Sequence, residues 1–357
     1  MLIKYRIIQN QNNNKKEISN KKVFNYGFAL LKTILSFFVI ISHYFKKNTT
    51  NNTIILTIAN NSIPHVPSFF LMSFYLMTIN LLKMSFHLLL KRLERLLIPY
   101  IIWPIIIWII NNSLLNKYNE KALYSYNLLK FQFLYGYGYM PQFWFLWNLV
   151  LITILFYIII FFFRKNYLFI FNLILIVSYQ LQYSNYCYNN IFLKLPNYNR
   201  YSISRLFGML PLASTGLIFG SYGAINFIQN NSKKSLILLI IIYNLINKYH
   251  VFANQRNGNY YGIDLNIKAI CIISIFSLFP SEKIHNQYLK KFLTTITNYS
   301  GGIYYLHLSI KYFFNPYFKD IKNGTFFGII INYNICYLIC FFGMLLFRKT
   351  TLKYLFF

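Results

Sequence analysis

Long apolar runs without alternation constrain this chain more than any other feature. Residues Leu149 to Phe163 read LVLITILFYIIIFFF, and several runs reach the roughly 20 residues that a helix needs to cross a bilayer. Inside lipid every backbone N–H and C=O must find a partner within the segment, which leaves helices or a closed barrel. A barrel strand would alternate polar and apolar side chains over about ten residues. The runs do not alternate, so we predict an all-α, polytopic integral membrane helix bundle.

We predict about ten transmembrane helices in this bundle. Charged residues make up only 11% of the 357, against about 25% in soluble domains. The stretch from Met84 to Leu97 mixes apolar and basic residues and is predicted as an interfacial helix. A Tyr-rich connection at 116–142 is expected to pack on the bundle. The predicted spans are residues 27–45, 63–82, 97–115, 143–163, 167–183, 205–224, 235–252, 260–280, 295–314 and 325–347.

The distribution of Lys and Arg predicts the orientation of the bundle. With the N-terminus inside, 20 of the 35 basic residues fall on the cytoplasmic side and 13 outside, in line with the positive-inside rule. The first 26 residues are polar and lack the early apolar region of a signal peptide. We therefore predict a basic cytoplasmic tail at 1–26, a transmembrane domain at 27–347 and a short cytoplasmic tail at 348–357. The predicted location is the plasma (inner) membrane.

The formal net charge of +29 does not indicate a nucleic-acid partner. Only six residues are acidic, no soluble basic domain is visible, and membrane proteins keep Lys and Arg in their loops. The four cysteines show no CxxC spacing, and Cys336 and Cys340 lie four apart in an apolar run, on one helix face. We interpret this pair as small packing residues. The sequence predicts neither a disulfide framework nor a metal site.

Two ionisable residues, Lys32 and His43, lie in the predicted first span. Eleven residues make about three turns, so both share nearly one face, about 16 Å apart along the axis. Ionisable groups inside spans usually face a cavity, a partner or a pathway. Histidine is the natural general base near neutral pH, and a cation can hold an anionic substrate group. We expect both to line one cavity. The alternative is that Lys32 reaches the cytoplasmic interface and His43 the outer one.

A basic stretch before the predicted third span contains Lys91, Arg92 and Arg95. One interpretation is ordinary anchoring by the positive-inside rule. The functional interpretation is a phosphate clamp at the cytoplasmic mouth of a cavity, because the Arg guanidinium binds phosphate through two parallel hydrogen bonds. A cytoplasmic acyl-CoA carries phosphates that would fit this clamp.

Two further residues within the predicted spans, His307 and Trp144, each allow two interpretations. His307, in the predicted ninth span, is either a hydrogen-bonded core residue or part of a site. Trp144 begins the fourth span and is either an interfacial anchor or a site residue. Asp264 and Lys268 lie four apart and can neutralise each other. The absence of GxSxG, Cys–His and HExxH patterns argues against a serine hydrolase and a zinc protease.

Five local patterns, in this order, resemble those of the membrane acyltransferase family 3, the integral membrane O-acyltransferases that act on surface glycans. The resemblance covers about residues 25 to 345. The family usually has Arg at the position of Lys32 and Gly at that of Phe74. The patterns are LLKTILSFFVIISHYF at 30–45, VPSFFLMS at 66–73, KRLERLLIPY at 91–100, FWFL at 143–146 after the Tyr135–Gly136 turn, and IYYLH at 303–307.

The resemblance implies transfer of an acyl group, often acetyl, from cytoplasmic acyl-CoA to a hydroxyl of a cell-surface or lipid-linked saccharide. His43 would be the catalytic base and Lys32 would stand in the family's cation position. The substrate- and donor-binding residues would be Arg92, Arg95, Ser73, Trp144 and His307. No bound cofactor is implied, since acyl-CoA is a substrate.

Two other functions stay open at this point. A saccharide exporter of the same fold would move its cargo without acylating it, and the Lys32 and Phe74 departures keep this alternative open. An assembly subunit of a glycan-synthesis complex is the other.

Overall fold

The computed structural model describes residues 25–44, 64–82, 85–114, 126–136, 140–183, 197–249, 263–279, 286–314 and 325–356. Every regular element in these ranges is a helix, which confirms the all-α prediction. The helices are α2 (Tyr26–Tyr44), α4 (His65–Leu82), α5 (Phe86–Leu114), α6 (Tyr126–Tyr135), the 3₁₀ helix η1 (Pro141–Phe143), α7 (Trp144–Phe162), α8 (Tyr167–Tyr183), α9 (Asn197–Ser221), α10 (Ala224–Asn230), α11 (Ser232–Tyr249), α12 (Ile263–Ser277), α13 (Gln287–Phe314), α15 (Phe326–Phe347) and the 3₁₀ helix η5 (Thr351–Leu355).

Several of these helices are long and apolar enough to cross a membrane. Four meet this criterion, namely α2, α5, α7 and α15, and the bent pair of α9 and α10 makes up to five. Each of the ten predicted ranges overlaps a helix, but the count of about ten spans is not confirmed. Helix α12 has only 15 residues, and α13 is polar over its first half. The protein is thus a multi-pass helical membrane protein.

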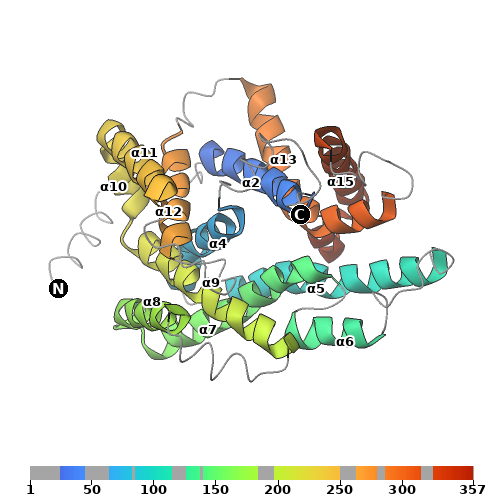
Figure 1. Ribbon diagram of the computed structural model, residues 1–357, viewed down its shortest axis with the longest axis horizontal. Coiled ribbons are helices and arrows are strands. Elements are labelled where there is room, and N and C mark those ends of the chain that lie inside the picture. The colour runs from blue at the N-terminus through green and yellow to red at the C-terminus, as the bar shows by residue number, and fades with distance from the viewer. Residues whose placement is uncertain are drawn as a thin grey trace.

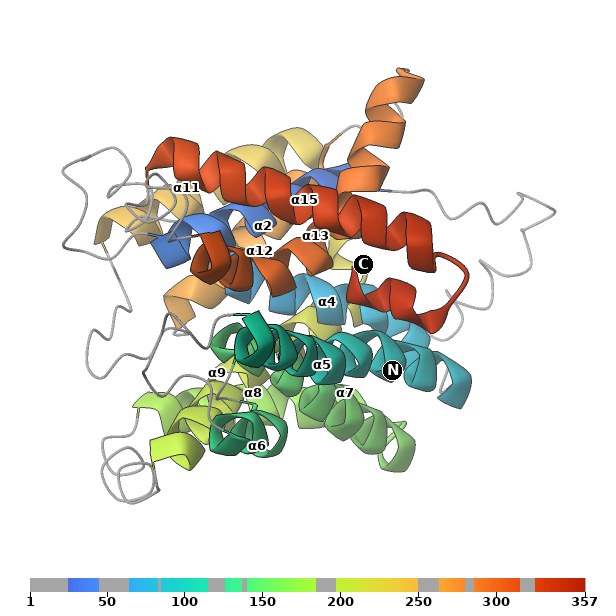
Figure 2. The same ribbon diagram turned by 90° about the vertical axis from the view of Figure 1, so that its right-hand side faces the viewer.

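Helix α4 lies near the middle of the bundle, with α2 beside it (Figure 1). Helix α9 packs along α4, and α13 packs along α2 and α15. Glycines permit the α4–α9 approach: Gly216 sits against the backbone of Leu71, and Gly220 against the side chain of Thr78. Small residues let transmembrane helices approach closely, so both glycines hold α4 against α9. Turned by 90°, the molecule shows α15 crossing one face above α5 and α7 (Figure 2).

Helix α5 corrects one prediction. From Phe86 onward, the basic stretch expected to form a separate interfacial helix is continuous with the third predicted span. Two prolines, Pro99 and Pro104, lie inside this 29-residue helix. Each proline removes only its own N–H donor, and transmembrane helices tolerate this because neighbouring groups satisfy the freed carbonyl. Arg92 and Arg95 therefore lie on the same continuous helix as the apolar segment.

The described parts of the predicted 116–142 connection, residues 126–136 and 140–142, pack on the bundle, as predicted. The Tyr100 hydroxyl donates to the carbonyl of Gln132, and the Gln132 side chain accepts the Met140 N–H at 2.9 Å. Gly136 turns the chain with φ of 69°, a backbone conformation that favours glycine. A Cβ at Gly136 would collide with Trp147, whose ring stacks on Tyr100 at 5.5 Å.

The two chain ends differ in what the structure describes. Of the predicted tail at 1–26, residues 1–24 lie outside the described part of the chain. In the predicted tail at 348–357, η5 folds back onto α5 and α15, and Tyr354 and Leu355 are buried. Cys336 and Cys340 are buried on α15, in agreement with their interpretation as packing residues.

Candidate active site

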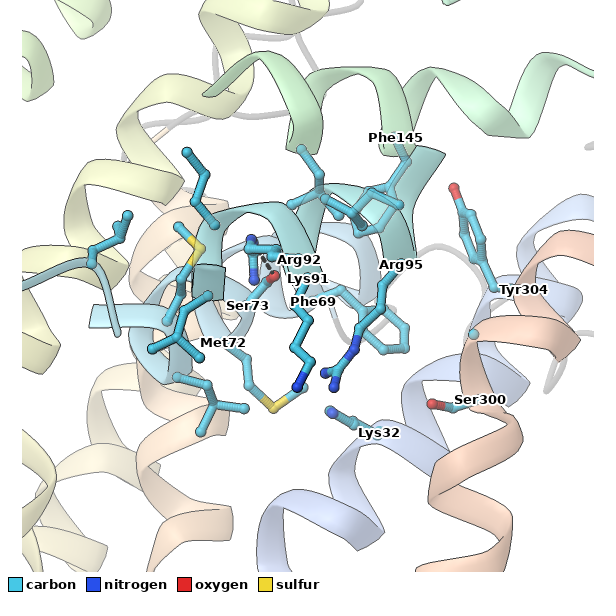
Figure 3. Close-up of a pocket in the computed structure, with 18 of the residues that line it drawn as sticks. Lys32, Phe69, Met72, Ser73, Lys91, Arg92, Arg95, Phe145, Ser300 and Tyr304 are labelled. Atoms are coloured by element: carbon cyan, nitrogen blue, oxygen red, sulfur yellow. Dashed lines mark hydrogen bonds between the residues drawn. The ribbon is translucent and has the colours of Figure 1, made fainter. Parts of the chain in front are cut away.

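A cavity of about 550 Å³ lies between α2, α4, α5, α7 and α13 (Figure 3). Four cations contribute to its wall, and the lining residues that the structure describes include no carboxylate. The cations are Lys32 from α2 and Lys91, Arg92 and Arg95 from α5. Without a compensating acid, such a wall favours an anionic ligand. The sequence-predicted cations Lys32, Arg92 and Arg95 are therefore brought together from two helices.

Arg92 is held in place by two hydroxyl groups from different helices. Its Nη2 donates to Ser73 Oγ of α4 at 2.9 Å, and its Nε donates to Thr153 Oγ1 of α7 at 3.1 Å. The guanidinium also lies 5.4 Å from the centre of the Phe74 ring, within cation–π range. Hydroxyls are neutral, so they orient the guanidinium without cancelling its charge. The position of Ser73 in the cavity wall is explained by this contact.

The other three cations gather at one side of the cavity. Figure 3 shows the charged ends of Lys32, Lys91 and Arg95 directed toward one another. Arg95 also lies over the ring of Tyr354, with 5.6 Å between the guanidinium carbon and the ring centre. Like charges at close range repel one another. A polyanion bound between these three cations would relieve that repulsion and would be attracted by each of them.

The rest of the cavity wall is largely apolar. Phe69 and Met72 of α4 and Phe145 of α7 contribute to it, and on the α13 side Ser300 and Tyr304 line it (Figure 3). A ligand with a charged end and an uncharged arm matches this division into a basic and an apolar part.

His43 lies at the other end of α2 and does not line this cavity. Its side chain is exposed, and its ring centre is 5.1 Å from that of His307 on α13. Its carbonyl accepts a hydrogen bond from Lys311 Nζ at 2.7 Å, which satisfies a carbonyl near the end of α2. We expected Lys32 and His43 to line one cavity, whereas of these two only Lys32 lines the cavity described here.

His307 is fully buried and firmly held. Its Nδ1 lies 2.7 Å from the Tyr304 carbonyl, and its own carbonyl accepts from Asn332 Nδ2 at 3.0 Å. The Tyr304 ring is 5.9 Å from the His307 ring and also lines the cavity. Tyr304 therefore connects the basic cavity with the histidine pair. Sequence reasoning missed Tyr304, although it stands three residues before His307 and so nearly one helical turn away.

Trp144 is buried at the start of α7, where Arg205 of α9 lies 4.7 Å from its ring centre. Arg205, Lys311 and His65 all act electrostatically on His43, so this end of the molecule also collects basic groups. Sequence reasoning gave none of these three a role. Of the three, Arg205 could most readily have been singled out from the sequence, because it is a charged residue at the first position of a predicted span.

Fold and site together define a class: a multi-pass helical membrane protein in which Tyr304 lies between a basic cavity and paired histidines. The chain belongs to acyltransferase family 3, since the family's model, described as an acyltransferase domain, matches residues 25–355. This confirms the family that the sequence patterns indicated, and it extends the matched domain through η5. Searches of curated proteins and of solved structures gave no match.

Proposed function

We propose that this acyltransferase is a membrane O-acyltransferase that moves an acyl group, expected to be acetyl, from cytoplasmic acyl-CoA to a saccharide hydroxyl. The saccharide is a cell-surface or lipid-linked glycan, and both chain termini are cytoplasmic in the plasma (inner) membrane. One observation carries the proposal: a cavity with four cations in its wall extends to Tyr304, whose ring lies beside the His43–His307 pair.

The donor end of the proposed site is the basic part of the cavity. The phosphates of acyl-CoA would bind Arg92, Arg95, Lys91 and Lys32. Arg92 is already oriented by Ser73 and Thr153, so binding requires less ordering of its side chain. The uncharged pantetheine arm and the acyl group would follow the apolar wall toward Tyr304.

His43 would act as general base at the acceptor end. The acceptor hydroxyl oxygen attacks the thioester carbonyl carbon while a ring nitrogen of His43 takes the hydroxyl proton. The C–O bond forms, the C–S bond breaks, and the thiolate of CoA leaves and takes up a proton. The exposed side of His43 and the partly exposed Arg205, which is held against the buried Trp144, offer a surface for the saccharide. General-base assistance is typically worth about 10²–10⁴-fold in rate.

The test is transfer of label from acetyl-CoA to candidate glycans by the purified protein. We expect His43→Ala to lose at least about a hundredfold in transfer rate, in the range typical of a lost general base. His43→Gln should not restore the rate, because an amide cannot take the proton. His87→Ala is the matched control, since His87 is an exposed histidine on α5 outside the cavity lining.

The outcomes separate the candidate functions. Transfer that depends on His43 and not on His87 supports the acyltransferase. Movement of glycan across a vesicle membrane without label transfer would instead support an exporter of the same fold. Full transfer by His43→Ala would show that the base is another residue.

A further inference from the structure

The hydrogen bonding of His307 determines which of its nitrogens carries a proton. Nδ1 lies 2.7 Å from the Tyr304 carbonyl, which only accepts hydrogen bonds. In a neutral imidazole Nδ1 is therefore the donor, and Nε2 holds a lone pair. His307 is fully buried, and its Nε2 has no hydrogen-bond partner among the residues that the structure describes. A buried acceptor without a donor is unfavourable and calls for an explanation.

His43 can supply the missing donor. Two imidazoles joined edge to edge by an N–H···N hydrogen bond have ring centres about 5 Å apart. The His43 and His307 centres are 5.1 Å apart with 39° between the ring planes. His43 is exposed and lies in the last turn of α2. The Lys311 contact to its carbonyl holds the backbone at this point.

We propose that His307 is a positioning residue for His43, an inference that rests on the proposed function. Nε2 of His307 accepts the ring N–H of His43, which places the lone pair of His43 on its other nitrogen, toward the exposed side. There it meets the acceptor hydroxyl. When His43 takes the proton, it keeps its hydrogen bond to His307, and the positive ring stays oriented by a neutral acceptor. A third group that orients the base is a general feature of such sites.

This role differs from the substrate-binding role that the sequence patterns assigned to His307. With no exposed surface, His307 has no face on which a saccharide or acyl-CoA could lie. Its neighbours also immobilise it: Asn332 binds its carbonyl, and Cys336 donates to the Asn332 side chain at 3.2 Å. A rigid, buried acceptor next to an exposed base is the arrangement that positioning requires.

Two substitutions at His307 separate positioning from a merely structural role. Asn places an amide group at the Nδ1 position, so it keeps a donor to Tyr304 and loses the acceptor. Gln places its oxygen at the Nε2 position, so it keeps the acceptor and loses the donor. A structural role predicts that His307→Asn is the better variant. Positioning predicts the reverse order.

The measurement is the kcat and KM of acetyl transfer for both variants, with Leu308→Ala as control for cavity formation on α13. We expect His307→Gln to keep kcat within about tenfold of the unchanged protein, and His307→Asn to lose about a hundredfold, as for a misplaced general base. The KM values for acyl-CoA and glycan should change less than about threefold, since neither substrate touches His307. An Asn variant as active as the Gln variant, or a loss in glycan KM alone, would overturn the inference.

A second measurement does not depend on activity and is made first on the unchanged protein. Solid-state NMR of the ¹⁵N-histidine-labelled protein in lipid should show coupling between two imidazole nitrogens across an N–H···N hydrogen bond. The coupling should disappear in His43→Gln. If the coupling is present but the unchanged protein transfers no acyl group, only the proposed function fails. If transfer occurs without coupling and without the Gln-over-Asn order, only the positioning role fails.

Discussion

Arg92 shows how single residues at the cavity are constrained by contacts from other helices. Ser73 and Thr153 orient its guanidinium, and Phe74 lies beneath it. Phe74 is fully buried and packs against Phe156 of α7 at 5.2 Å. The phenylalanine that stands where the family usually has glycine therefore fills the α4–α7 contact and supports a cation of the cavity.

Removal of the two arginines should weaken donor binding. We expect the double change of Arg92 and Arg95 to Gln to raise the apparent KM for acyl-CoA by tenfold or more, because charge-assisted contacts to phosphate are each worth about 1.5–3 kcal/mol. Donor saturation curves provide the measurement. The double change of the exposed Arg164 and Arg348 to Gln is the matched control for net charge. Unchanged saturation in the first variant would remove both arginines from the donor site.

Phe74 should contribute to donor binding through Arg92. Phe74→Leu keeps an apolar side chain and removes the aromatic face, so we expect the KM for acyl-CoA to rise about two- to fivefold, equivalent to about 0.5–1 kcal/mol. Phe70→Leu is the control, because Phe70 is equally buried on α4 and stacks on Phe74, but makes no such contact with Arg92. Equal KM changes in the two variants would mean that packing alone is responsible.

At the scale of whole elements, the C-terminal segment closes the bundle. The Trp103 indole of α5 donates to the Leu355 carbonyl at 2.9 Å. Phe356 is buried, meets the Trp103 ring edge to face at 5.8 Å and stacks on Phe347 of α15. Gly302 of α13 lies directly against the Phe356 backbone. The segment thus ties α5, α13 and α15 together next to Arg95.

Loss of the Phe356 side chain should destabilise the folded protein. We expect Phe356→Ala to cost on the order of 3 kcal/mol, as for other buried Phe→Ala changes, and to lower Tm by several degrees in detergent. Phe342→Ala on α15 is the control, because Phe342 is 57% exposed in the bundle. Thermal unfolding followed by intrinsic fluorescence provides the measurement. A Tm equal to that of the control would mean that the segment is not part of the stable core.

At the scale of the whole molecule, the orientation in the membrane remains a prediction from the basic residues. Helix α15 is among the helices long enough to span, so its two ends should face opposite sides. A cysteine-free variant with Lys349→Cys should react with a membrane-impermeant maleimide only after the cells are opened. Phe326→Cys, exposed at the other end of α15, should react in intact cells. Labelling of position 349 in intact cells would reverse the orientation.

The sequence by itself determined the helical membrane class, the family and most helix positions. Apolar runs such as that from Leu149 to Phe163 allow only helices in lipid, because backbone groups must pair within the segment. Helix boundaries near 167–183 and 326–347 followed from the ends of such runs. The Met84–Leu97 stretch was misjudged, because mixed apolar and basic residues do not reveal whether a helix continues through Pro99.

Only the tertiary structure decided which residues meet. Lys32 and Arg95 are 63 positions apart in the chain, and their charged ends converge because α2 and α5 border one cavity. The facing of His43 and His307 depends on how α2 packs along α13, which spacing within one helix cannot predict. Periodicity reports the face of a single helix, whereas side-chain packing between helices sets their rotation and depth, and with them the contents of the site.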